Sequence, residues 1–276
     1  MIIYNRDDTS TGRISLSKGN QIKINVGNIW YKADYLGYEG ASEIASSDIL
    51  SQSNVEEIAP FVKYEFDIIT LNNKKYNGCR SFDFTNGKEI TTLDEFFLIK
   101  TDHRAEDYLK GLSVRDKIQK TVDLVQNNTN INNFGEYLTL LFELDSFIYN
   151  DDRHFNNIAL LYDNNADDYY LCPVFDNGAS FLSDEEEYGK AEKIGLIRKE
   201  VKSKPFSTDF KEQTDICRSL YGEQLKFNED VCLSPETKKV ICENYGETVL
   251  SRIENTIDFS KNIYPEMLIT KVLEDI

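Results

Sequence analysis

The feature that most constrains this chain is a strongly apolar segment followed at once by a dense polar one. Residues 134–149 carry apolar side chains at helical spacing and predict a buried helix. The next segment, Asn150 to Asn157, is polar or charged at every position except Phe155. Because burying polar groups without partners costs free energy, such a cluster directly after a buried helix indicates a functional loop.

The stretch before residue 85 is predicted to be mainly β-structure. Short runs alternate apolar and polar side chains and are separated by Lys18-Gly19-Asn20 and Gly27-Asn28. One helix with an apolar stripe is expected among them. The expected strands are 13–17, 21–26, 28–33, 61–69 and 76–84, and the expected helix is 39–51.

From about residue 91 the apolar spacing becomes helical. Two short strands, 158–162 and 169–175, are expected to form a hairpin directly after the polar cluster. No repeat or flexible linker separates the two parts of the chain. The sequence therefore predicts an α+β fold with two lobes, a β-rich N-lobe over 1–85 and a mainly helical C-lobe over 86–276.

Composition excludes several functional classes. The chain has 276 residues and a formal net charge of −17, which argues against nucleic acid as a direct partner. No apolar run is long enough to cross a bilayer, and the N-terminus lacks the pattern of a signal peptide. Five cysteines without a CxxC pair and only two histidines argue against structural zinc. We expect a cytoplasmic protein with reduced thiols and no membrane partner.

The polar cluster contains two residues with the spacing of a phosphoryl-transfer loop. Such transfer needs a carboxylate that accepts the proton of the attacking hydroxyl, and an amide oxygen that holds Mg²⁺. Asp152 and Asn157 are five residues apart, as in the H-R-D-x-x-x-x-N pattern of protein kinases. After the expected hairpin, Asp176 lies at a strand end before Gly178, which would free the backbone there. The hairpin would bring Asp176 back to Asn157, so that both reach one metal ion.

The β-rich stretch supplies the residues expected to hold ATP. Lys32 lies on a predicted strand, and Glu43 follows on the predicted helix, with Glu39 as the rival partner. In kinases a strand lysine binds the phosphates of ATP and a helix glutamate holds that lysine. An ordinary exposed strand lysine is the alternative. The turn that contains Ser17, Lys18 and Gly19 is expected to cover the phosphates with backbone N–H groups.

Together these motifs resemble the HipA-like family of bacterial serine/threonine kinases. The resemblance covers about residues 12–225 and is carried by Asn150-x-Asp152-Arg153-His154-x-x-Asn157 and Phe175-Asp176-Asn177-Gly178, with weaker matches at 38–43, 76–81 and 204–207. It implies a bilobed protein-kinase-like fold in which Asp152 is the catalytic base, Asn157 and Asp176 bind Mg²⁺, and Lys32 contacts ATP.

Two departures from that family stand out. The phosphate loop has fewer glycines, and the N-terminal extension that grips an antitoxin is absent or very short. The resemblance implies a toxin or effector kinase with a protein substrate and an antitoxin or other regulatory partner. It also implies self-phosphorylation within the phosphate loop, at Ser17 or, second, Ser15. Whether such a kinase acts inside the cell or after secretion is left open.

Three alternatives remain at this stage. His154 either orients the catalytic loop or contacts a phosphate, or it is an ordinary packed histidine. The Asp-Arg-His-x-x-Asn motif also resembles phosphoinositide kinases, which allows a lipid or a small molecule as the substrate. A pseudokinase that binds nucleotide and a partner without turnover is the alternative outside the enzymes.

Overall fold

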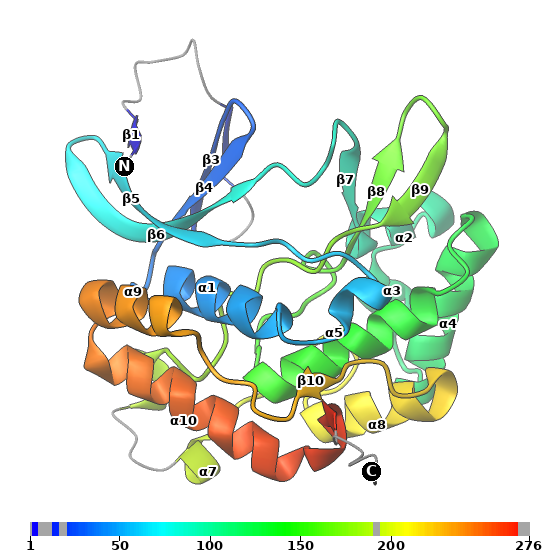
Figure 1. Ribbon diagram of the computed structural model, residues 1–276. Helices are drawn as coiled ribbons and strands as arrows, with labels where there is room; N and C mark the ends of the chain where they lie inside the picture. Colours follow the sequence, from blue (N-terminus) through cyan, green and yellow to red (C-terminus); the bar gives the residue numbers. More distant parts are fainter. Residues whose placement is uncertain (1, 5–12, 17–20, 190–193, 270–276) are drawn as a thin grey trace, which may run out of the picture.

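The computed structural model describes residues 2–4, 13–16, 21–189 and 194–269. An N-terminal sheet stands over helix α1, and most of the other helices lie below and beside it (Figure 1). The sheet has the strand order β1-β5-β6-β4-β3-β2, in which β1 pairs with β5 in parallel and all other neighbours are antiparallel. Its strands are β1 (Ile2–Tyr4), β2 (Arg13–Leu16), β3 (Ile22–Val26), β4 (Ile29–Ala33), β5 (Glu65–Leu71) and β6 (Lys74–Phe82), and α1 spans Glu39–Leu50.

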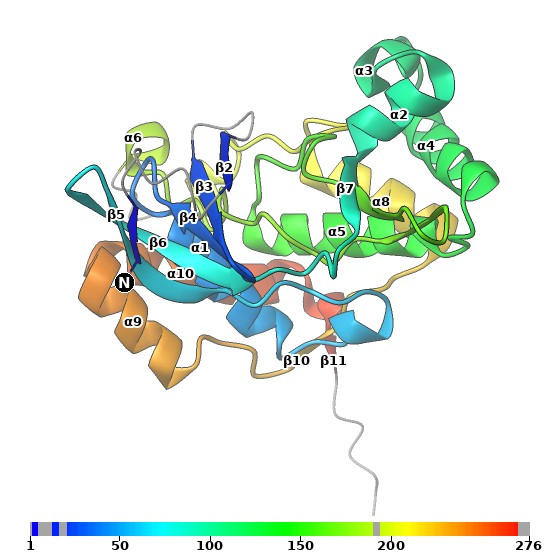
Figure 2. The same ribbon diagram turned by 90° about the horizontal axis from the view of Figure 1, so that it is seen from above.

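The C-terminal part is mainly helical. A second sheet, of order β7-β8-β9, lies on its upper side, and from above the N-terminal sheet and helices α2 to α4 lie at opposite ends of the molecule (Figure 2). The strands are β7 (Glu89–Thr92), β8 (Ala159–Asp163), β9 (Asp168–Leu171), β10 (Phe227–Asn228) and β11 (Leu268–Ile269). The helices are α2 (Leu93–Thr101), α3 (Ala105–Tyr108), α4 (Val114–Asn128), α5 (Phe134–Ile148), α6 (Glu185–Tyr188), α7 (Ile194–Ile197), α8 (Phe210–Tyr221), α9 (Pro235–Tyr245) and α10 (Glu247–Ile263), with short 3-10 turns at Val55–Glu57 and Pro265–Met267.

Turn chemistry fixes the register of the N-terminal sheet. Asn72 and Asn73 both adopt positive φ, 48° and 64°, which suits the tight hairpin between β5 and β6. Gly27, at φ 63°, closes the hairpin between β3 and β4. The resulting register places Lys23 directly opposite Lys32, so both side chains lie on the same face of the sheet.

Helix α5 forms the centre of the hydrophobic core, as the apolar pattern predicts. All of its residues except Glu136 are buried. It ends where Tyr149 takes a left-handed conformation, at φ 54°, and the polar loop begins at the next residue. The most buried helix of the molecule therefore fixes the start of the loop that carries Asp152.

Backbone hydrogen bonds link the segment before β5 to the chain that leads to Asp176. Val62 N donates to Val174 O at 2.9 Å, and Val174 N donates to Pro60 O at 2.8 Å. Phe61 and Val174 form an isolated parallel bridge between them. The segment that enters β5 is thus hydrogen-bonded directly to the segment that leads to Asp176.

The α+β fold class is confirmed, and the differences from the prediction concern short strands. The expected strand 61–69 begins only at Glu65, and the expected strand 169–175 ends at Leu171. The reason is that residues 60–62 and Val174 hydrogen-bond to each other instead of extending these strands. Strand β7 was not predicted, since it forms by pairing with β8, which lies about seventy residues further along the chain.

None of the helices that the structure describes is long and apolar enough to span a bilayer.

Candidate active site

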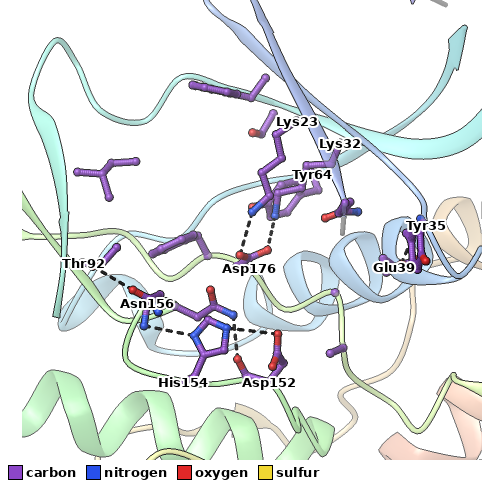
Figure 3. Close-up of a pocket in the computed structure, with 18 of the residues that line it drawn as sticks. Lys23, Lys32, Tyr35, Glu39, Tyr64, Thr92, Asp152, His154, Asn156 and Asp176 are labelled. Carbon is purple, nitrogen blue, oxygen red and sulfur yellow. Dashed lines mark hydrogen bonds and ion pairs between the residues drawn. The ribbon is translucent and has the colours of Figure 1, made fainter. Parts of the chain in front are cut away.

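A pocket of about 840 Å³ lies between the N-terminal sheet and the polar loop. Its roof consists of side chains from one face of β3, β4 and β6, and its floor consists of the polar loop and the segment around Asp176 (Figure 3). The predicted residues that line it are Lys32, Asp152, His154, Asn157 and Asp176.

Lys32 is held between two carboxylates. Its ammonium forms an ion pair with Glu43 Oε1 and lies 2.7 Å from Asp176 Oδ1. The Lys32 ammonium also lies 4.9 Å from the centre of the Tyr64 ring. Glu43 is completely buried, and its second oxygen accepts a hydrogen bond from Asn177 N at 2.9 Å. The pair predicted from the sequence is therefore formed, and Glu43 holds both the lysine and the segment after Asp176.

The rival glutamate has a different task. Glu39 accepts hydrogen bonds from the backbone N–H groups of the four residues before it, 35 to 38, and so closes the turn at the start of α1. Glu43 lies one turn further along α1, where it is completely buried and pairs with Lys32.

The electrostatics of this cluster keep Lys32 and Asp176 charged. Burial alone would lower the pKa of Lys32, but Asp176 and Glu43 together raise that pKa well above its ordinary value. Burial would raise the pKa of Asp176, but the ammonium groups of Lys32 and Lys23 outweigh it and hold that pKa well below its usual range. Asp176 is thus an ionised carboxylate that faces the pocket.

Lys23 is a site residue that the sequence analysis did not place there. Its ammonium lies 3.1 Å from Asp176 Oδ2, so that two lysines on neighbouring strands bind one carboxylate (Figure 3). Strand alternation gives the face of a side chain but not the register between strands. Only the pairing of Lys23 with Lys32 brings the two cations together, and no sequence signal revealed that pairing.

Arg153 builds the scaffold of the floor. Its side chain is 1 % exposed and makes hydrogen bonds of 3.0 Å to both carboxylate oxygens of Asp145 on α5. The same guanidinium donates to the backbone oxygens of Asn157 and Phe175 and to Asn177 Oδ1. One buried side chain therefore ties helix α5, the polar loop and the Asp176 segment together. The motif named this residue but gave it no role.

Asp152 projects from the loop at the rim of the pocket. One of its carboxylate oxygens lies 3.0 Å from Lys204 Nζ, and the other lies 3.6 Å from His154 Nε2. His154 Nδ1 accepts a hydrogen bond from Asn156 N at 3.2 Å, which fixes the ring beside Asp152 (Figure 3). The His154 side chain is partly exposed and lines the pocket, so it is not a packed core residue.

Asn157 and Asp176 offer the oxygen atoms that Mg²⁺ prefers. Asn157 Nδ2 donates to Asp152 O at 2.8 Å, which fixes the amide group. Within 2–4, 13–16, 21–189 and 194–269, no group donates to Asn157 Oδ1, and no three acidic, histidine or cysteine side chains form a metal site by themselves. These two residues fit a metal ion that takes its remaining ligands from phosphates and water.

The backbone at the Asp176 turn differs from the expectation. Asp176 itself adopts the left-handed conformation, at φ 60°, whereas Gly178 has no positive φ. A Cβ atom at Gly178 would lie 3.3 Å from Glu39 Cβ, so this glycine permits close packing against α1. The predicted phosphate-loop residues Ser17, Lys18 and Gly19 lie outside the described residues.

Part of the pocket lining is aromatic. Trp30 lies on β4 two residues before Lys32 and on the same face, opposite Ser81 of β6. Tyr64, Phe84 and Phe175 line the same region. Aromatic rings and cationic side chains in one pocket suit a molecule with an aromatic base and an anionic tail.

Comparisons with known proteins support a kinase fold. No protein-family model matches the chain, and no curated protein matches its sequence. Among solved structures it is similar to the Helicobacter pylori proinflammatory kinase CtkA, with 15 % identity, 96 % of each chain covered and a TM-score of 0.57.

Two other solved structures are more distant. HipA of Shewanella oneidensis, in a complex with HipB and operator DNA, has 11 % identity over 95 % of this chain and 69 % of its own, with a TM-score of 0.44. The aminoglycoside phosphotransferase APH(4)-Ia has 11 % identity over 90 % and 95 % of the two chains, with a TM-score of 0.29. The likeness to the CtkA structure shows that the chain has a kinase fold, which confirms the predicted bilobed α+β fold class.

Proposed function

We propose that this protein transfers the γ-phosphoryl group of ATP, with Mg²⁺, to serine or threonine hydroxyls of a protein. One observation carries the proposal. Lys32, which Glu43 holds, lines the same pocket as Asp176 and Asp152, and the pocket also has aromatic side chains of the kind that stack on a purine base. The kinase fold of the chain agrees with this chemistry.

The transfer follows from the positions of the side chains. The hydroxyl oxygen of the substrate forms a bond to the γ-phosphorus while Asp152 accepts the proton of that hydroxyl. The bond between that phosphorus and the β–γ bridging oxygen breaks, and ADP leaves with its electron pair. Lys32 and Lys23 bind the phosphates from the roof, and Lys32 is kept in place by Glu43. Holding the reactants in line and stabilising their charge supplies most of the rate.

Asn157 and Asp176 are the residues that would hold Mg²⁺. When bound, the ion neutralises charge on the β- and γ-phosphates. Asp176 is ionised and ready for this task, since Lys23 and Lys32 hold the pKa of that carboxyl low. These lysines then become free to bind phosphate oxygens.

The choice of a protein acceptor rests on the resemblance to HipA-like serine/threonine kinases. The same resemblance supports a role as a toxin or effector with an antitoxin or other regulatory partner. Phosphorylation of a lipid or a small molecule, and nucleotide binding without turnover, are the results that would replace this proposal.

The test uses the single tryptophan of the chain as its probe. Because Trp30 lines the pocket, its fluorescence should change when ATP and Mg²⁺ are added, and ADP should form. With labelled ATP and a cell lysate, the label should appear on phosphoserine or phosphothreonine. Label only on lipid or small molecules would replace the protein acceptor, and binding without ADP would indicate a pseudokinase.

Self-phosphorylation is the regulatory part of the proposal. Ser15 on β2 pairs with Lys23 on β3, which places it next to the phosphate-binding strands, and Ser17 follows it in the chain. A phosphoserine there adds about two negative charges that would repel ATP. After incubation with ATP and Mg²⁺, mass spectrometry should find phosphate on Ser17 or Ser15 but not in the Asp152→Asn variant. If neither serine carries phosphate in the active enzyme, the proposal of self-phosphorylation is wrong.

A further inference from the structure

The ammonium group of Lys204 contacts Asp152, one of the residues that line the pocket. Lys204 Nζ lies 3.0 Å from Asp152 Oδ1, the carboxylate that accepts the proton in the proposed function. The residue comes from a segment about fifty positions after the catalytic loop. We propose that Lys204 is a catalytic residue that binds the transferring phosphoryl group while it orients Asp152, an inference that rests on the proposed function.

The loop that carries Lys204 is held in place by hydrogen bonds to a buried side chain. Gln213 on α8 is 1 % exposed, and its amide nitrogen donates to Ser203 Oγ at 3.0 Å and to Lys204 O at 2.9 Å. Its amide oxygen accepts hydrogen bonds from the backbone N–H groups of Phe206 and Ser207. These bonds hold the Ser203 side chain before the lysine and the backbone from Lys204 O to Ser207 N after it, so Lys204 leaves the surface from a defined position.

The same loop packs directly on the catalytic loop. Phe206 is buried, with its ring centre 5.4 Å from that of Phe155 and 5.7 Å from that of Phe142 on α5. Phe155 lies three residues after Asp152 in the catalytic loop. The ring contact therefore fixes the distance between the backbone of Lys204 and the backbone of Asp152 from inside the core.

Stability does not explain this arrangement. The Lys204 and Asp152 side chains are 48 % and 45 % exposed, and an ion pair as exposed as this contributes at most about 1 kcal/mol. Near a phosphoryl group in transfer, an ammonium is worth more, because negative charge collects on the oxygens around the phosphorus. In an in-line phosphoryl transfer, the attacking hydroxyl oxygen lies between the Asp152 carboxylate and the γ-phosphorus. An ammonium in contact with Asp152 is therefore within reach of a phosphoryl oxygen.

The experiment compares Lys204→Met, which removes the charge but keeps most of the stem, with Lys204→Arg and Lys202→Met. Lys202 is the matched control, because it is exposed two positions earlier and has no ion pair among the described residues. ADP formation gives kcat and KM. Trp30 fluorescence gives the affinity for ATP with Mg²⁺, and for ADP with Mg²⁺ and aluminium fluoride, a mimic of the transferring group.

Lys204→Met should lower kcat about 100-fold and weaken the aluminium fluoride complex to a similar degree. Its KM and ATP affinity should stay within about twofold of wild type, Lys204→Arg should recover part of both losses, and Lys202→Met should behave as wild type. Wild-type binding of the aluminium fluoride complex by Lys204→Met overturns the inference, as does an equal loss of ATP affinity. If wild-type protein binds neither nucleotide, the proposed function itself fails.

Discussion

Two buried charged networks meet at Asn177 and differ in what lies around them. In the first, Arg153 and Asp145 are each 1 % exposed. In the second, Lys23 and Asp176 keep 20 % and 16 % of their side-chain surface exposed to the pocket. Asn177 joins them, because its side chain accepts from Arg153 and its backbone N–H donates to Glu43.

The difference separates scaffold from binding site. In the Arg153 network the partners are all protein groups that the fold encloses, so no ligand can take their place. In the Asp176 network the carboxylate divides its two oxygens between two lysines at the edge of a pocket. Phosphates and a metal ion can replace these partners one for one, which makes this network able to bind and release a ligand.

The largest effect is expected at Asp176, in the network that faces the pocket, and at Asp152, the proposed base. Asp176→Ala and Asp152→Asn should each lower ADP formation by at least about 1,000-fold, because one removes the proposed metal ligand and the other the proposed proton acceptor. Only Asp176→Ala should also weaken Mg²⁺-dependent ATP binding, measured by Trp30 fluorescence. Turnover close to wild type in either variant would contradict the assignment.

Substitutions in the Arg153 network should lower the stability of the fold. Asp145→Ala leaves Arg153 charged and buried without its carboxylate, which should lower the free energy of unfolding by about 3–5 kcal/mol in urea denaturation. Glu65→Ala is the control, since it breaks the exposed pair with Arg80 and should cost at most about 1 kcal/mol. Equal losses in the two variants would refute the distinction between the networks.

A smaller effect is expected for the lysine that the sequence did not reveal. Lys23→Met should weaken ATP binding about tenfold, the equivalent of ~1.4 kcal/mol for one charged hydrogen bond. Lys75→Met, at an exposed position of β6, should leave the affinity unchanged. Unaltered ATP affinity in Lys23→Met would leave Lys32 as the sole phosphate-binding lysine of the described roof.

A further effect concerns pH. The pKa of Asp176 is lower in the folded protein than its ordinary 3.8, so ionisation of this carboxyl favours the folded state above that pH. The contribution should disappear as the pH falls through the folded-state pKa. The free energy of unfolding of wild type should therefore fall more steeply than that of Asp176→Asn between about pH 4 and pH 2. Parallel curves would show that the lysines do not lower this pKa.

The sequence predicted the elements that local pattern determines. The apolar stripe of α5, the Asn72-Asn73 turn and the Lys32–Glu43 pair all follow from spacing within a short segment. Strand β7 and the position of Lys23 depend on pairing between strands, which spacing does not reveal.

The scaffold was missed for a related reason. Arg153 stands inside a recognised motif, but its partners lie on α5 and after β9, and only the tertiary structure brings them together. Lys204 reaches Asp152 in the same way, through a loop that Gln213 and Phe206 fix from the core. Long-range contacts, rather than residue types, thus account for what the sequence alone did not predict.

The backbone bonds between residues 60–62 and Val174 have a consequence for how the pocket works. They connect the segment that enters β5 with the one that leads to Asp176, so the sheet cannot move far from the metal-ligand turn without breaking main-chain hydrogen bonds. The entropy cost of bringing Lys32 and Asp176 together is therefore met when the chain folds. A nucleotide that enters meets a preorganised cleft, and its binding free energy is available for aligning the reactants.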